Sequence, residues 1–252
     1  TSMFFVVPTP AAIADHLAHH LTELNRSKPD GILGLATGST MEPVYAKLLD
    51  HAKQKNSPDL SRLTTFNLDE YIGLPASHPQ SYNHYMHQHL FDRLGLRDSQ
   101  VNLPNGTCTD LEHECAQYSA AIANAGGLDF QLLGVGTNGH IGFNEPGTPF
   151  DSLTHVIELS DNTRLDNSRF FDDPAEMPTH AITMGIRDIL EAKEVVLVAT
   201  GEHKADVMNL LYRTPADPGM PASALKLHPN ARIYLDAAAA SRLPQEALYH
   251  VE

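Results

Sequence analysis

The sequence predicts an α/β fold built from βαβ units around a largely parallel sheet. Two observations predict it. Short β-branched or aliphatic runs alternate along the chain with longer stretches of helical periodicity. Several of these runs lead into a polar or glycine-rich turn, and in open α/β sheets ligands bind beyond the carboxyl ends of the strands. The chemistry of the protein is therefore expected in those turns.

The expected elements follow in chain order. Strands are expected at Gly31–Leu35, Leu63–Leu68, Phe130–Val135, Val156–Leu159, Val195–Ala199 and Arg232–Leu235. Helices are expected at Ala11–Leu24, Pro43–His51, Ser81–Leu90, Leu111–Ala125, Met184–Glu191 and His203–Tyr212. Alternation of the two lists is typical of a parallel sheet flanked by helices.

Length and composition favour one domain. The chain has 252 residues, 42% of them hydrophobic, which is enough for one sizeable core. No Ser/Gly-rich linker or charge block divides it, so residues 1–252 are expected to form a single domain. The stretch of about residues 144–178 is polar and irregular, which suits either a lid over the site or a surface excursion without a gating role.

Charge and cysteine content exclude several classes of function. The formal net charge of −14 argues against a nucleic-acid partner, since nucleic acid needs a basic surface. No apolar run approaches the roughly 20 residues that span a bilayer, so no membrane partner is expected. Cys108 and Cys115 are too few for a disulfide framework and indicate free thiols in a cytoplasmic protein. An anionic substrate would need local cations on so acidic a chain.

The first informative turn is Ala36–Thr40, between an expected strand and an expected helix. Gly38 allows close approach of a ligand, and the hydroxyls of Ser39 and Thr40 add donors beside the free N–H groups of a helix N-terminus. These features predict a phosphate-binding loop. It is not a Walker loop, because the Gly-Lys-Ser/Thr sequence that ends such a loop is missing. Helix capping by either hydroxyl is the alternative.

The second turn, Phe66–Tyr71, ends a strand with two adjacent carboxylates. Neighbouring residues of a strand point to opposite faces, so Asp69 and Glu70 are expected to do different jobs. One of them could act as a general base in a partly desolvated cleft. A solvated turn or a helix cap is the alternative for such a pair.

The third turn, Gly134–Pro146, is rich in glycine and follows an expected strand. His140 lies within it and has an ordinary pKa suited to proton transfer near neutral pH. Asn138 and Glu145 are close enough in sequence to orient its ring. The glycine spacing does not fit a dinucleotide-binding fingerprint.

Arg169 and Lys204 are local cations that a phosphate site on an acidic protein would require. His84, His87 and His89 lie close together, but no further ligand completes a zinc set, so structural or surface roles are expected and no metal site.

Ordered motifs over nearly the whole chain resemble the glucosamine-6-phosphate deaminase family. They are Leu33–Gly38, Phe66–Tyr71, Gly134–Pro146, Asn167–Phe171 and Leu227–Pro229, and the Phe143–Pro146 segment is the most specific of them. The resemblance implies a Rossmann-like fold without metal or organic cofactor. It implies that the substrate is an amino sugar phosphate, glucosamine 6-phosphate, which the enzyme converts to fructose 6-phosphate and ammonia.

The resemblance also implies roles for single residues. Asp69 would move the proton between C2 and C1 of the opened sugar, and His140 would open the ring. Glu145 and Asn138 would hold the imidazole; many relatives carry Asp at the place of Asn138. The phosphate would be bound by Gly38, Ser39 and Thr40 together with Arg169 and Lys204.

Departures from the family pattern affect regulation and the phosphate loop. Ser39 and Met41 stand where relatives commonly have Gly and Pro. His155 and Ile157 occupy the positions at which hexameric relatives bind an N-acetylated effector, so no activation by N-acetylglucosamine 6-phosphate is expected. The chain resembles the shorter bacterial forms, for which a monomer or small homo-oligomer is expected.

Three alternatives remain open at this stage. A galactosamine-6-phosphate deaminase would keep nearly all of these residues. A 6-phosphogluconolactonase shares a similar glycine-rich turn but lacks the Asn-Glu-Pro continuation. A sugar-phosphate sensor without turnover would need only the phosphate and hydroxyl contacts.

Overall fold

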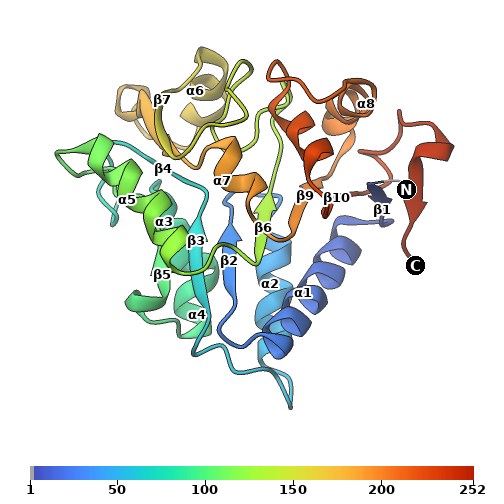
Figure 1. The fold of residues 1–252 in the computed structure, drawn as a ribbon, viewed down its shortest axis with the longest axis horizontal. Helices are drawn as coiled ribbons and strands as arrows, with labels where there is room; N and C mark the ends of the chain where they lie inside the picture. The colour runs from blue at the N-terminus through green and yellow to red at the C-terminus, as the bar shows by residue number, and fades with distance from the viewer. Residues whose placement is uncertain (1–2) are drawn as a thin grey trace.

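A parallel sheet forms the centre of the computed structural model, which describes residues 3–252 (Figure 1). Its strand order is β11-β1-β10-β9-β6-β2-β3-β5, and every neighbouring pair is parallel. The strands are β1 (Phe4–Val6), β2 (Ile32–Leu35), β3 (Thr64–Asn67), β5 (Val101–Asn102), β6 (Phe130–Leu133), β9 (Val195–Ala199), β10 (Ala231–Leu235) and β11 (Leu248–His250). The predicted fold class, a mostly parallel sheet flanked by helices, is confirmed.

The helices are α1 (Pro10–Ser27), α2 (Glu42–Ala52), α3 (Tyr82–Met86), α4 (Asp92–Leu94), α5 (Leu111–Asn124), α6 (Asp161–Ser168), α7 (Ile186–Leu190) and α8 (Ala205–Arg213). Local chemistry fixes their starts. Thr9 caps α1 by accepting from Ala12 N at 3.1 Å, ahead of a proline in the first turn. Ser81 caps α3 by accepting from His84 N at 3.0 Å. A π-helical segment, His87–Phe91, joins α3 to α4.

Burial shows that helices cover both faces of the sheet. Every residue of β2, β6 and β9 is buried, as expected for parallel strands that lie between two layers of helices. The large side chains of Tyr45 and Phe130 are fully buried in this core. The sheet is therefore a rigid base for the loops at its carboxyl edge.

A second, antiparallel sheet was not expected. It consists of β4 (Asp69–Tyr71), β8 (His180–Thr183) and β7 (His155–Glu158), in that order. The strand expected at Val156–Leu159 exists as β7, but it belongs to this sheet and not to the central one. Its residues alternate between half-buried and exposed, which is typical of an antiparallel strand with one solvated face.

The segment of residues 144–178 is more regular than its composition predicted. It contains β7 and α6, in addition to a short 3₁₀ turn at Pro174–Glu176. Figure 1 shows β7 and α6 beyond the arrowheads of β2, β3 and β6, on the side where the site is expected. Its role as a lid stays a prediction.

The edge strand β11 and its neighbour β1 were also missed, and both are only three residues long. β1 lies between β10 and β11, and Figure 1 shows the two ends of the chain near each other beside it. No helix among residues 3–252 combines the length and apolar character that crossing a membrane requires.

Candidate active site

A cleft of about 610 Å³ opens at the carboxyl ends of β2, β6 and β9, next to β4. The turns identified in the sequence meet there. Gly38, Ser39, Thr40, Asp69, Asn138, His140, Arg169 and Lys204 all line it. Of the proposed site residues, Glu145 alone does not line the cleft. Glu145 lies behind Asn138, whose side chain donates a hydrogen bond to it.

The loop after β2 presents its polar groups to the cleft. Gly38 has φ +113°, a conformation that glycine adopts without strain, and Tyr85 Oη donates to its carbonyl at 2.7 Å. The N-cap of α2 is Met41, and no side chain caps this helix. The capping alternative for Ser39 and Thr40 is therefore wrong. In the described part of the chain both hydroxyls are free to bind a ligand.

Asp69 and Glu70 point in different directions, as the strand pattern predicted. Glu70 accepts hydrogen bonds of 2.9 Å from the backbone N–H groups of Tyr71, Tyr82 and Asn83, and so fixes the start of α3. Asp69 lines the cleft and is only 6% exposed. No hydrogen bond to its carboxylate is present within residues 3–252.

Burial and the neighbouring Glu70 carboxylate raise the pKa of Asp69 to about 8. A carboxylate in such surroundings is a stronger base than one in water. Burial also raises the pKa of Glu70, to about 7, although its three backbone hydrogen bonds oppose the shift. The position and basicity of Asp69 suit a group that removes a proton from a bound molecule.

The glycine-rich loop holds His140 against its own backbone. Gly136 N donates to His140 O at 2.9 Å, and Gly139 N donates to Gly136 O at 2.9 Å. A Cβ atom at Gly136 would lie 2.0 Å from His140 Cε1. Only glycine fits there, because the imidazole ring occupies that space.

Asn138 joins His140 to Glu145. The Asn138 Nδ2 group donates to Glu145 Oε2 at 2.9 Å, and Asn138 Oδ1 lies 2.7 Å from His140 Nδ1. An ionised carboxylate only accepts, so it requires the NH₂ side of the amide. The amide oxygen then faces the ring, so Nδ1 carries the proton and Nε2 is left as an acceptor. Glu145 thus sets the tautomer of His140 through Asn138 without touching the ring.

Surrounding charges have opposing effects on His140. Burial lowers the pKa of His140 and Lys204 lowers it further, whereas Glu145 and Asp166 raise it. The net direction is downward, so the imidazole is neutral at pH 7. A neutral ring with a free Nε2 can take up a proton and return it.

Two cations lie at the cleft beside these groups. Lys204 Nζ donates to Val135 O, and burial lowers the pKa of this lysine, with Asp166 acting in the opposite direction. The Arg169 guanidinium lies 4.7 Å from the centre of the Phe170 ring. Arg169 forms no ion pair in the described residues, so its donors remain available to an anion.

Sequence reasoning missed other residues of the cleft, namely Tyr82, Thr163, Asp166 and His203. One signal was available. Asp166 lies three residues before Arg169, and residues at that spacing share one face of a helix. Its carboxylate acts electrostatically on both His140 and Lys204. The polar helix α6 thus contributes to the site at several positions.

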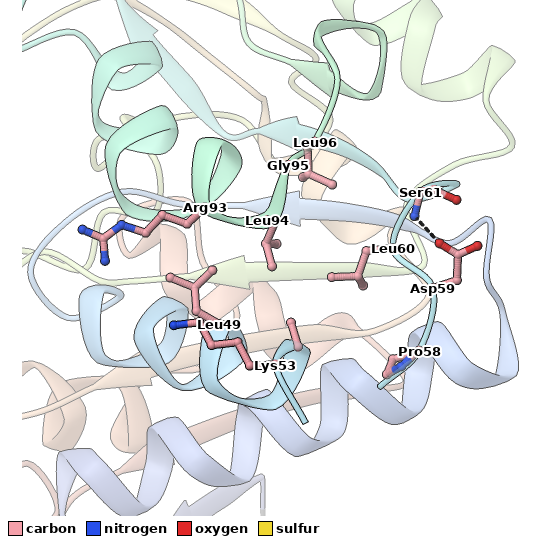
Figure 2. A pocket seen from close by; sticks show the side chains of 11 residues that line it. Leu49, Lys53, Pro58, Asp59, Leu60, Ser61, Arg93, Leu94, Gly95 and Leu96 are labelled. Atoms are coloured by element: carbon pink, nitrogen blue, oxygen red, sulfur yellow. Dashed lines mark hydrogen bonds between the residues drawn. The ribbon is translucent and has the colours of Figure 1, made fainter. Parts of the chain in front are cut away.

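A second hollow, of about 350 Å³, lies at the opposite edge of the sheet (Figure 2). Its lining is largely apolar; Leu49 and Lys53 lie side by side at the end of α2, and Arg93 and Leu60 lie on the other sides of the hollow. The carboxylate of Asp59 accepts from Ser61 N at 2.8 Å, and that hydrogen bond lowers the pKa of Asp59. This hollow has cations but no free base beside them, so it lacks the chemistry of the first cleft.

The family of the chain follows from comparison with known proteins. A family model described as glucosamine-6-phosphate isomerases/6-phosphogluconolactonase matches residues 9–234. The chain belongs to this family. The match covers each of the three turns that meet in the cleft and both cations.

Members of the family with high identity carry one name. A protein of Bacillus pumilus named glucosamine-6-phosphate deaminase is 52% identical over 215 residues, which are 85% of this chain and 89% of the relative. A Rhodopirellula baltica protein of the same name is 48% identical over 242 residues, 96% of each chain.

Solved structures that resemble this chain include one at high and one at low identity. A monomeric glucosamine-6-phosphate deaminase superimposes with a TM-score of 0.92 at 40% identity, covering 95% of this chain and 99% of its own. The 6-phosphogluconolactonase of Trypanosoma cruzi superimposes with a TM-score of 0.76 at 19% identity, covering 96% and 97%. The second likeness concerns the fold alone.

Proposed function

We propose that this chain is a glucosamine-6-phosphate deaminase, which converts glucosamine 6-phosphate and water into fructose 6-phosphate and ammonia. One observation carries the proposal: the buried, unpaired carboxylate of Asp69 shares a cleft with the neutral imidazole of His140 and the cations Arg169 and Lys204. The relatives named above support the choice of substrate.

In the proposed reaction the phosphate is bound between Arg169, Lys204 and the loop of Gly38, Ser39 and Thr40. The guanidinium offers a planar fork and the ammonium a point charge. Held by this end, the sugar places its ring near His140. The imidazole then moves the proton from the O1 hydroxyl to the ring oxygen, which opens the ring to the aldehyde.

Asp69 acts on the open form. The aldehyde acidifies the proton on C2, and the Asp69 carboxylate removes it to give an enolamine. Returning this proton to C1 leaves an imine at C2. Water adds to the imine and ammonia departs, so C2 becomes the ketone of fructose 6-phosphate. Each proton that is taken up is given back, and no oxidant or reductant is consumed.

Asn138 and Glu145 keep the His140 ring in the tautomer that this scheme needs. Asn138 is neutral, so it orients the ring without the full charge that an Asp would add beside an imidazolium. We infer that ring opening proceeds through a neutral His140 with Nε2 facing the substrate.

The remaining expectations are proposals of the same standing. All proposed site residues except Glu145 line one cleft, and we infer a monomer. The solved relative described as monomeric agrees with this. The lid role of residues 144–178 and the cytoplasmic location stay predictions.

The test is the purified protein with glucosamine 6-phosphate, with ammonia and fructose 6-phosphate measured together. Release of both in equal amounts supports the proposal. Turnover of galactosamine 6-phosphate alone would change the epimer. Hydrolysis of 6-phosphogluconolactone alone would replace the deaminase by a lactonase, and binding of the amino sugar without either product would indicate a sensor.

A further inference from the structure

The carboxylate of Glu145 receives hydrogen bonds from two sides. On one side Asn138 Nδ2 donates to Oε2. On the other, Thr163 Oγ1 donates to Oε1 at 3.0 Å, from the first turn of α6. Ser160 Oγ is 3.4 Å from the same oxygen. Glu145 therefore lies between the loop that carries His140 and the helix that carries Arg169.

The Thr163 hydroxyl has no other structural task that explains its position. Ser160 is the N-cap of α6 and accepts from Thr163 N at 3.1 Å, so capping uses the backbone of Thr163 and not its side chain. Ser160 Oγ donates to Thr163 Oγ1 at 2.9 Å, which leaves the Thr163 proton for Glu145. Thr163 is buried, with 6% of its surface exposed.

The shorter contacts of this network define one arrangement of its hydrogens, with Glu145 Oε1 at 3.4 Å as a second acceptor for Ser160. Ser160 donates to Thr163, Thr163 donates to Glu145, Asn138 donates to Glu145, and His140 Nδ1 donates to Asn138. Reversing the Asn138 amide would set its oxygen against the Glu145 carboxylate, two acceptors facing each other. Removing the Thr163 hydroxyl would release one oxygen of Glu145 and loosen the orientation of the amide beyond it.

The same helix ends at a proposed phosphate ligand. Arg169 is the C-cap of α6, six positions after Thr163, or about 9 Å along a helix axis. Asn167 Nδ2 donates to Thr163 O at 2.9 Å and ties the two ends of this short helix together. Arg169 and Thr163 are thus connected through one short helix.

We propose that Thr163 is a positioning residue that holds Glu145 and, through Asn138, the protonated Nδ1 of His140, and that α6 links this orientation to anion binding at Arg169. The part that concerns ring opening rests on the proposed function. The part that concerns the tautomer of His140 does not.

The first experiment compares Thr163→Val, which keeps the shape but removes the hydroxyl, with Thr163→Ser, which keeps the hydroxyl. Thr22→Val in α1 is the matched control, because Thr22 is also a buried helical threonine and its hydroxyl donates only to Ala18 O. Thr163→Val is expected to lower kcat about 10-fold with KM changed less than about 3-fold, the loss of one hydrogen bond to a charged group. Thr163→Ser and Thr22→Val are expected to stay within about 3-fold of wild type.

The second experiment needs no turnover. The ¹⁵N signals of the His140 imidazole, assigned with a His140→Gln variant, report which nitrogen carries the proton. Wild type and Thr163→Ser should show protonated Nδ1, and Thr163→Val should show a mixture of tautomers. Inorganic phosphate should sharpen the wild-type signal and leave that of Thr163→Val unchanged.

Each outcome decides something different. An unchanged kcat and an unchanged imidazole spectrum in Thr163→Val would overturn the positioning role. If inorganic phosphate leaves the His140 signals of wild type unchanged, the proposed link between Arg169 and His140 through α6 would be overturned. A wild type that makes no ammonia would refute the proposed function while the spectra still test the tautomer. If Thr163→Val does not fold, Thr163→Ala against Thr163→Ser gives the same contrast.

Discussion

Thr183 lies directly opposite Asp69 in the antiparallel pair of β8 and β4, and its hydroxyl accepts a hydrogen bond of 3.2 Å from Phe143 N. The glycine before Phe143 packs against the same hydroxyl, since a Cβ at Gly142 would come within 2.9 Å of it. One buried threonine thus touches both the strand of the proposed base and the loop of the imidazole.

Asp69→Asn should abolish useful turnover of glucosamine 6-phosphate. The amide keeps the shape of the side chain but cannot remove the C2 proton, and positioned acid–base groups contribute about 10²–10⁴-fold each. Steady-state ammonia release measures the effect. Asp50→Asn, on the exposed side of α2, is the control and should retain wild-type kcat. A near-normal rate in Asp69→Asn would remove this residue from the mechanism.

The same variant should be more stable than wild type at alkaline pH. The pKa of Asp69 is raised from 3.8 to about 8, so between these values the folded chain holds a proton that the unfolded chain has lost. The free energy of unfolding of wild type therefore falls as pH rises through this range. An Asn side chain does not ionise, so the variant escapes this fall. We expect the free energy of unfolding of Asp69→Asn to exceed that of wild type by about 2 to 5 kcal/mol at pH 9.

Urea unfolding at pH 4, 7 and 9 measures this gain. The difference between the two proteins should be smallest at pH 4, because the folded carboxyl is neutral there and the unfolded one, with a pKa of 3.8, is only partly ionised. A constant difference at all three pH values would mean that packing, and not ionisation, separates them.

Asn138→Asp should raise the pKa of His140. The added carboxylate stands 2.7 Å from Nδ1, and it outweighs the effects already exerted by Glu145, Lys204 and Asp166. The pKa of His140 still rises if the new carboxyl and Glu145 share one proton, because their remaining negative charge then lies closer to the imidazole ring than the charge of Glu145 alone. The imidazolium would persist to higher pH, so kcat/KM at pH 6 should fall relative to pH 8.

An NMR titration of His140 checks the shift directly. Asn124→Asp, on an exposed turn of α5, adds the same charge far from the ring and should leave the titration unchanged. A lower His140 pKa in Asn138→Asp would contradict the assignment of the relay.

N-acetylglucosamine 6-phosphate should not activate the enzyme. His155 and Ile157 line a hollow of about 620 Å³ behind Glu145, and no Lys or Arg is among the residues that line it. An isoleucine cannot bind phosphate. The rate at sub-saturating substrate should stay constant as the N-acetylated sugar is added, apart from competition at the cleft; a clear increase would disprove the prediction.

Much of the central sheet was readable from the sequence, because β2 and β9 are continuous apolar runs, β6 is apolar except for Gln131, and the turns after them carry unusual chemistry. β11 was not, since its three residues show no pattern that separates them from a loop. The strand at residues 155–158 was found, but its partners were not, because alternation reveals a solvated face and says nothing about which strand lies beside it.

The candidate site shows the same limit. Asp69 and His140 stood out by residue type within distinctive turns. Thr163 did not, because its value depends on its proximity to a carboxylate 18 residues earlier, and a polar helix offers several equivalent hydroxyls. Glu145 was expected to hold the ring together with Asn138, and the structure places it behind the amide instead.

The position of β1 affects how the chain is assembled. Its neighbours are β10 and β11, so Phe4 pairs with Ile233 and Leu248 near the far end of the sequence. During synthesis β1 is made long before β10 and β11, and it can form no sheet hydrogen bond until those two strands follow. Pairings between such distant segments close slowly. The sheet is therefore completed late in synthesis, and β1 is an apolar strand that chaperones have time to bind before it pairs.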